Sequence, residues 1–128
     1  MYERKTSPSL NCGLDLIGEV LYGKWKIRLL WFINEGHKRP SELQRKIPDA
    51  TRRVLNMQLK ELEDHGLVTR TVYPVVPPKV EYNLTGFGKT LIPVIATLGH
   101  WADAHEERLR KVILKRAVRS DDDALIDL

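Results

Sequence analysis

The chain has 128 residues, 42% of them hydrophobic and 30% charged, with a formal net charge of +4. A chain of this size fits one domain that can bury a core without disulfides or metals, and it contains no apolar run near the roughly 18 residues that a membrane span needs. Its single cysteine excludes an intrachain disulfide and a cysteine-rich zinc site. Because no signal peptide is evident, we expect a cytoplasmic protein that does not enter a membrane.

Two helices are predicted in the first third of the chain. Apolar side chains at Leu14, Ile17 and Leu21 recur at helical spacing, which predicts a helix over residues 12–21. Residues 24–34 are apolar on most sides, a pattern typical of a central buried helix.

A helix-turn-helix is predicted over about residues 41–65. Ser41 and Gln44 have the spacing of a capping box, which predicts a short helix beginning at Ser41. After a turn, Thr51 is expected to cap a second helix that runs to residue 65. A glycine then terminates that helix.

A β-hairpin and a long helix follow. Residues 67–73 alternate and are rich in β-branched side chains, which predicts a strand. The segment 74–78 must be a loop because three of its five residues are prolines without a backbone N–H, and residues 80–84 return as the second strand. We expect a last helix over about residues 86–118, kinked at Pro93.

This order of elements predicts an α+β, mainly α fold, namely a winged helix-turn-helix with a two-stranded wing and N- and C-terminal dimerisation helices. A single domain over residues 1–118 would hold the helix-turn-helix (about 41–65), the wing (about 67–84) and the two dimerisation helices (about 12–21 and 86–118). Residues 119–128, with one Arg and four Asp, form an acidic tail. Residues 38–53 instead hold six Lys or Arg and only two acidic side chains, a charge pattern that fits either a polyanionic partner such as nucleic acid or a soluble protein that is simply basic.

Several strings resemble the HxlR family of bacterial transcriptional regulators, which are MarR-like winged-helix proteins. They are Gly23-Lys24-Trp25, the LKELE string of residues 59–63 and the segment 66–85, which contains YPVVPPKVEYNLT. With Cys12, the resemblance covers about residues 12–102. It implies a homodimer built on the terminal helices and bound to a pseudo-palindromic operator. The chain departs from the family at Pro40, where an aromatic residue is usual.

The helix over residues 51–65 carries side chains of the types that read DNA bases. If its leucines are buried, a rotation of about 100° per residue turns Arg53, Asn56, Met57 and Lys60 outward. Arg suits guanine, Asn suits adenine and Met suits the thymine methyl, although a solvated helix face has the same composition. The predicted DNA-binding residues, including those expected on phosphates, are Ser41, Gln44, Arg45, Lys46, Thr51, Arg52, Arg53, Asn56, Met57, Lys60, Arg70 and Lys79.

Cys12 is the candidate redox sensor, since some members of the resembled family detect oxidants or electrophiles with a thiol at this position. The alternative is a buried thiol that acts as a small hydrophobic residue. The expected partners are double-stranded DNA, a second copy of the chain and a small-molecule or oxidant signal. The expected dimer interface comprises Leu14, Ile17, Leu98, Trp101, Leu109 and Val112.

Two other function classes fit the sequence less well. A winged helix that binds protein would present an apolar or acidic outward face on the 51–65 helix, whereas this face is basic and polar. An enzyme would need a nucleophile elbow, a phosphate loop or a dinucleotide fingerprint, and none is recognisable. The four histidines lack a ligand spacing for metal. We therefore predict no catalytic, metal-binding or cofactor-binding residues.

Overall fold

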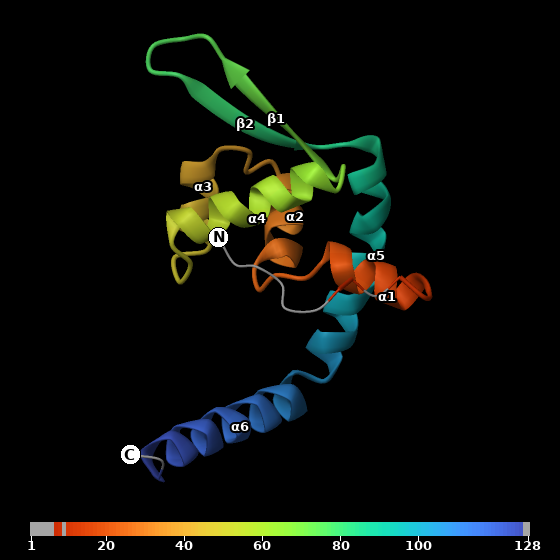
Figure 1. Cartoon of the computed structure of the whole chain (residues 1–128), viewed down its shortest axis with the longest axis vertical. Helices are drawn as coiled ribbons and strands as arrows, with labels where there is room; N and C mark the ends of the chain where they lie inside the picture. The colour runs from red at the N-terminus through yellow and green to blue at the C-terminus, as the bar shows by residue number, and fades with distance from the viewer. Residues whose placement is uncertain (1–6, 9, 127–128) are drawn as a thin grey trace. The chain divides into compact units, whose positions relative to one another are not determined.

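The computed structural model describes residues 7–8 and 10–126, so residues 1–6 and 9 of the predicted domain and residues 127–128 of the predicted tail lie outside the described residues. This part of the chain is mainly helical, with one two-stranded sheet (Figure 1), which confirms the predicted fold class. The elements are α1 (Gly13–Val20), α2 (Lys26–Asn34), α3 (Pro40–Lys46), α4 (Arg52–Asp64), β1 (Val68–Tyr73), β2 (Lys79–Leu84), α5 (Gly86–Ala104) and α6 (Glu106–Ile126). The chain divides into two compact units, residues 1–92 and 93–128.

The core of the first unit is built on the helix-turn-helix. Leu55, Leu59 and Leu62 of α4 are buried, which confirms the predicted stripe. Helix α4 contacts α2, α3 and β1, so these elements form the core around it. Burying a leucine side chain contributes about 1.5–3 kcal/mol, so this stripe fixes which face of α4 turns outward.

The two helices of the helix-turn-helix begin differently from one another. Thr51 caps α4 as predicted, because its Oγ1 accepts a hydrogen bond of 3.2 Å from the backbone N–H of Val54. The capping box predicted for α3 is wrong. The helix begins at Pro40, whose ring presets the backbone for the first helical position, and the side chain of Gln44 instead donates to the carbonyl of Ala50 at 2.5 Å.

The hairpin forms the predicted wing. β1 and β2 are antiparallel, with Val68 opposite Leu84 and Tyr73 opposite Lys79. The Pro-rich segment between them is a loop, as predicted. One further backbone hydrogen bond, from the Tyr82 N–H to the Lys38 carbonyl (2.8 Å), holds the middle of β2 against the segment before α3.

The prediction of one last helix over residues 86–118 is wrong. Helix α5 continues through Pro93, and a break at His105 separates it from α6. There the imidazole Nδ1 lies 2.8 Å from the Trp101 carbonyl, while the backbone N–H of His105 bonds to Ala102 at 3.1 Å. The ring therefore contacts the carbonyl to which the backbone N–H of His105 itself would donate in a continuous α-helix. Because α6 reaches Ile126, most of the predicted acidic tail is helical.

In the described part of the chain, no helix is long and apolar enough to cross a lipid bilayer.

Candidate nucleic-acid interface

In Figure 1 the hairpin of β1 and β2 lies over α3 and α4. A groove runs between α4 and this hairpin. It consists of two adjoining hollows that share Pro40, Arg52 and Val80. We call it the α4–hairpin groove. Its lining residues are Arg39, Pro40, Ser41, Arg52, Asn56, Lys60, Glu63, Arg70, Val75, Val76, Pro77, Pro78, Lys79, Val80 and Tyr82.

The groove is basic. Five Lys or Arg side chains and one carboxylate line it, so it presents a net positive surface to solvent. These cations come from the segment before α3, from α4 and from both strands, elements that are distant in sequence. A concave surface lined by charges of one sign concentrates the field and attracts a polyanion.

The structure brings together half of the predicted DNA-binding residues and leaves the other half outside the groove. Those that line it are Ser41, Arg52, Asn56, Lys60, Arg70 and Lys79. Arg39 lines it too and was not predicted. The signal is present in the sequence, because Arg39 lies in the basic segment, but the predicted start of α3 at Ser41 is one residue too late.

The predicted residues outside the groove have different surroundings. Met57 is half-buried and lines a separate hollow with Tyr22, Gly23 and Lys24, so it does not share the surface of Asn56 and Lys60. The side-chain amide of Gln44 and the hydroxyl of Thr51 bond to the backbone. Arg45, Lys46 and Arg53 are exposed but line neither hollow of the groove.

Two groove cations form ion pairs within the protein. The Lys79 ammonium lies 2.9 Å from the Glu81 carboxylate and 4.9 Å from the centre of the Tyr73 ring. Lys60 lies 3.7 Å from Asp64. The hydrogen bond from Lys79 lowers the pKa of Glu81, and the positive charges of Lys38 and Arg39 lower it further. Glu81 is therefore ionised near neutral pH, and a phosphate must compete with it for Lys79.

Cys12 is exposed and occupies the N-cap of α1, where its side chain makes no capping hydrogen bond. The interpretation of a thiol buried in the core is therefore wrong for this chain. Among the described residues, no group of three His, Cys, Asp or Glu side chains is arranged to hold a metal ion.

Large apolar side chains are exposed in both units. In the first unit, Leu14 of α1 is 82% exposed, and Ile17 is half-buried. In the second unit, Leu98, Trp101 and Val112 are each more than half exposed. Leu109 is half-buried. Exposed apolar surface of this extent is typical of an interface with another macromolecule.

Comparison with known proteins identifies relatives along most of the chain. The model of the HxlR-like helix-turn-helix family matches residues 20–110. The HTH-type transcriptional regulator YdeP of Bacillus subtilis is 41% identical over 112 residues, which are 88% of this chain and 86% of YdeP.

Two solved structures are similar in both sequence and fold. The redox regulator HypR in its reduced form is 41% identical, with a TM-score of 0.74 over 78% of this chain and 99% of HypR. The reduced form of the transcriptional regulator YodB from B. subtilis is 33% identical, with a TM-score of 0.63 over 73% of this chain and 93% of YodB.

Proposed function

The chain belongs to the HxlR-like helix-turn-helix family of transcriptional regulators, and from this premise we propose that two copies of it bind one pseudo-palindromic operator in double-stranded DNA. The observation that carries this proposal is the α4–hairpin groove, where basic and amide side chains from α4 and the hairpin line one surface. A surface of this composition fits a polyanion whose bases offer hydrogen-bonding edges.

The groove residues divide into two roles. Helix α4 enters the major groove, where Asn56 pairs with adenine and Lys60 with guanine, since these side chains are exposed on its outward face. Arg39, Arg70 and Lys79 contact phosphates, which position the protein without reading sequence. Arg53, which is exposed and follows Arg52 of the groove in sequence, reaches the next base pair.

A second copy of the chain completes the binding unit. The exposed and half-buried apolar side chains of α1, α5 and α6 would be covered by the same elements of a partner chain, through Leu14, Ile17, Leu98, Trp101, Leu109 and Val112. In a symmetric dimer the two α4 helices enter successive major grooves, so the half-sites lie about one helical turn apart.

Selection of binding sites from random duplexes tests the proposal. We expect an inverted repeat with half-site centres about ten base pairs apart. Asn56→Ala should lose discrimination at one base pair per half-site, at a cost of about 1–3 kcal/mol. Lys79→Ala should weaken binding to all sequences equally and reduce the salt dependence. Recovery of random sequence only would contradict the proposal.

We further propose that DNA binding responds to oxidants through Cys12. The exposed thiol supports this proposal, as does similarity to HypR, a redox regulator. With one cysteine per chain, an intersubunit disulfide joins Cys12 of both protomers; the two thiols lose two protons and two electrons to the oxidant, here diamide, which is reduced to its hydrazine. A mixed disulfide with a small thiol and a sulfenic acid are the alternative products.

Gel shifts with and without diamide test the sensor. In the wild type, diamide should change operator affinity, and the change should reverse with dithiothreitol. Cys12→Ser should bind DNA normally and ignore diamide. A non-reducing gel distinguishes a disulfide dimer from the other two products. An identical response in Cys12→Ser would remove Cys12 from the mechanism but leave DNA binding intact.

A further inference from the structure

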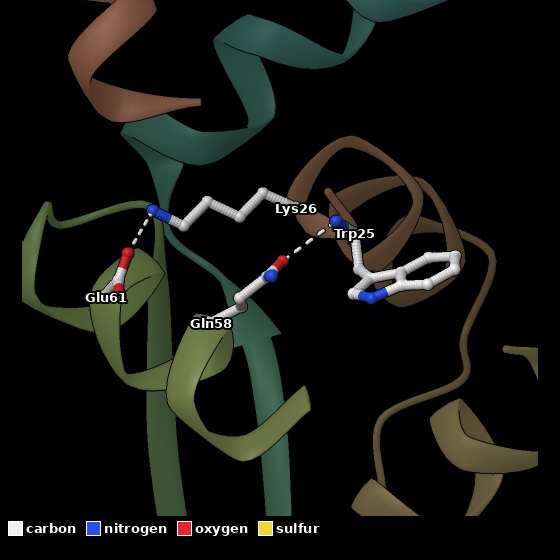
Figure 2. A network of polar contacts seen from close by, with 4 residues as sticks. All are labelled: Trp25, Lys26, Gln58 and Glu61. Atoms are coloured by element: carbon white, nitrogen blue, oxygen red, sulfur yellow. Dashed lines mark hydrogen bonds and ion pairs between the residues drawn. The ribbon is translucent and has the colours of Figure 1, made fainter. Parts of the chain in front are cut away.

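A buried lysine lies at the start of α2, outside the α4–hairpin groove. The Lys26 side chain is 1% exposed, and its Nζ lies 2.5 Å from Oε2 of Glu61 on α4, which is 44% exposed (Figure 2). Removing an ammonium group from water is costly even when it is paired, and an apolar side chain of similar size often stabilises a core as well or better. The position of Lys26 therefore calls for a role beyond stability.

A second polar contact joins the same two helices. Gln58 lies one turn before Glu61 on α4, and its Oε1 accepts a 2.9 Å hydrogen bond from the backbone N–H of Trp25. The two contacts lie side by side in Figure 2. Gly23 permits this close approach, because a Cβ there would lie 3.1 Å from Cε of Lys26 and 3.2 Å from Cδ of Gln58.

These contacts restrict α4 in a way that its leucines cannot. Apolar contacts are non-directional, so the leucine stripe tolerates small rotations of the helix. A hydrogen bond and a close ion pair one turn apart restrict both the rotation and the axial position, because a hydrogen bond weakens over a few tenths of an ångström and with misalignment.

The outward side chains depend on that rotation. Gln58 and Asn56 are two residues apart and so project on opposite sides of α4. A helix with its side chains has a radius of about 5–6 Å, so a rotation of about 10° moves an outward atom by roughly 1 Å. A displacement of that size exceeds what a hydrogen bond to a base edge tolerates.

We propose that Lys26 and Gln58 are positioning residues that set the rotation of α4, and thereby the base preference of the DNA-binding surface, without touching DNA. This inference rests on the proposed function. It assigns sequence discrimination partly to α2, whose first turn carries no groove residue.

The test compares matched variants of the full chain on the selected operator and on a duplex with one half-site base pair exchanged. The readout is the ratio of the two Kd values, measured alongside the Tm of each variant. Lys26→Met removes the positive charge and keeps a side chain of similar length, and the carboxylate of Glu61 is exposed enough to stay hydrated. Lys24→Met is the control, because it makes the same substitution at an exposed neighbouring position. Gln58→Met removes the acceptor, whereas Gln58→Glu keeps it.

We expect Lys26→Met and Gln58→Met to lower the ratio about tenfold, with unchanged affinity for random DNA, while Lys24→Met and Gln58→Glu keep the wild-type ratio. The Tm of Lys26→Met should equal or exceed that of the wild type. Wild-type ratios in both Met variants, even with altered Tm, would show a purely structural role. If Lys26→Met does not fold, the ratio of Kd values for Gln58→Met alone tests the proposal. A wild-type protein without base preference would instead contradict the proposed function.

Discussion

At the scale of single residues, the wing illustrates how an ion pair within the protein competes with a ligand. Lys79 is half-buried between Glu81 and the ring of Tyr73. This arrangement holds the ammonium near the groove at little entropic cost, but the carboxylate partly neutralises it. Because the folded pKa of Glu81 is lowered, its stabilising effect is present above the ordinary pKa of a glutamate and is lost only as the pH falls through the lowered value.

We therefore predict that Glu81→Gln increases DNA affinity. The substitution frees Lys79 for a phosphate and removes a negative charge next to Lys38 and Arg39. The affinity at low salt should therefore rise by roughly a few-fold, because a single partly screened charge is removed. Fluorescence anisotropy with operator and random duplexes measures this change, which should be equal for both. Asp64→Asn, beside Lys60, is the matched comparison on α4. A lower affinity in Glu81→Gln would mean that Glu81 orients Lys79.

At the scale of elements, the junction between the hairpin and α5 depends on one glycine. Thr85 caps the helix by accepting from the Gly88 N–H at 2.9 Å, and its hydroxyl lies 2.6 Å from the Gly66 carbonyl. A Cβ at Gly88 would collide with the Leu67 backbone carbonyl, just before β1. The first turn of α5 can approach the sheet this closely only because residue 88 has no side chain.

Gly88→Ala is accordingly expected to destabilise the fold by about 1–3 kcal/mol, the usual cost of overpacking. Gly86→Ala is the control in the same helical turn, because a Cβ at Gly86 meets no atom within 4 Å. It should leave stability unchanged or raise it slightly, as alanine favours helix. Urea denaturation followed by circular dichroism compares the two. Equal stability of both variants would show that the backbone moves apart without cost.

The sequence predicts most elements because their signals are local. The leucine stripe of α4, the Thr51 cap and the prolines of the wing loop each determine structure within a few residues. Two features were not predicted from the sequence, the start of α3 and the break at His105, and each has its own cause. The capping-box spacing points to Ser41, whereas the ring of Pro40 presets the backbone angle of the first helical position and starts α3 earlier. At the break, the His105 ring contacts a carbonyl that ordinary helix periodicity assigns to a backbone N–H.

The candidate site was only partly predictable. Helical periodicity correctly turns Asn56 and Lys60 outward, but it cannot show that Met57 lies toward Tyr22 and Gly23. Tertiary contacts between α4 and the start of α2 decide that. The Lys26–Glu61 pair could not be predicted from the sequence either, since a lysine in a helical pattern is normally exposed and its burial depends on tertiary packing.

At the scale of the whole molecule, the exposed apolar side chains are the main argument for a second copy of the chain. Trp101 is 57% exposed and stacks on His105, with ring centres 4.7 Å apart. Exposed tryptophan is enriched among the residues that dominate interface energies.

Trp101→Glu should therefore raise the dimer dissociation constant by at least about tenfold, because it places a charge in an apolar interface. Sedimentation equilibrium over a range of protein concentrations measures the constant. His100→Glu adds the same charge at the exposed neighbouring position and should leave the dimer intact. Unchanged association of Trp101→Glu would place the interface elsewhere on the chain.

The most direct test of the central claim, that the α4–hairpin groove binds DNA, is an anisotropy titration of the selected operator over a series of salt concentrations. Besides Lys60, which is proposed to read a base, four groove cations per chain in two copies give the surface about eight charges for phosphates. We predict that log K falls with log salt with a slope steeper than about −4, corresponding to at least four or five phosphate contacts. No binding even at the lowest salt would contradict the account and would favour a winged helix that binds protein instead.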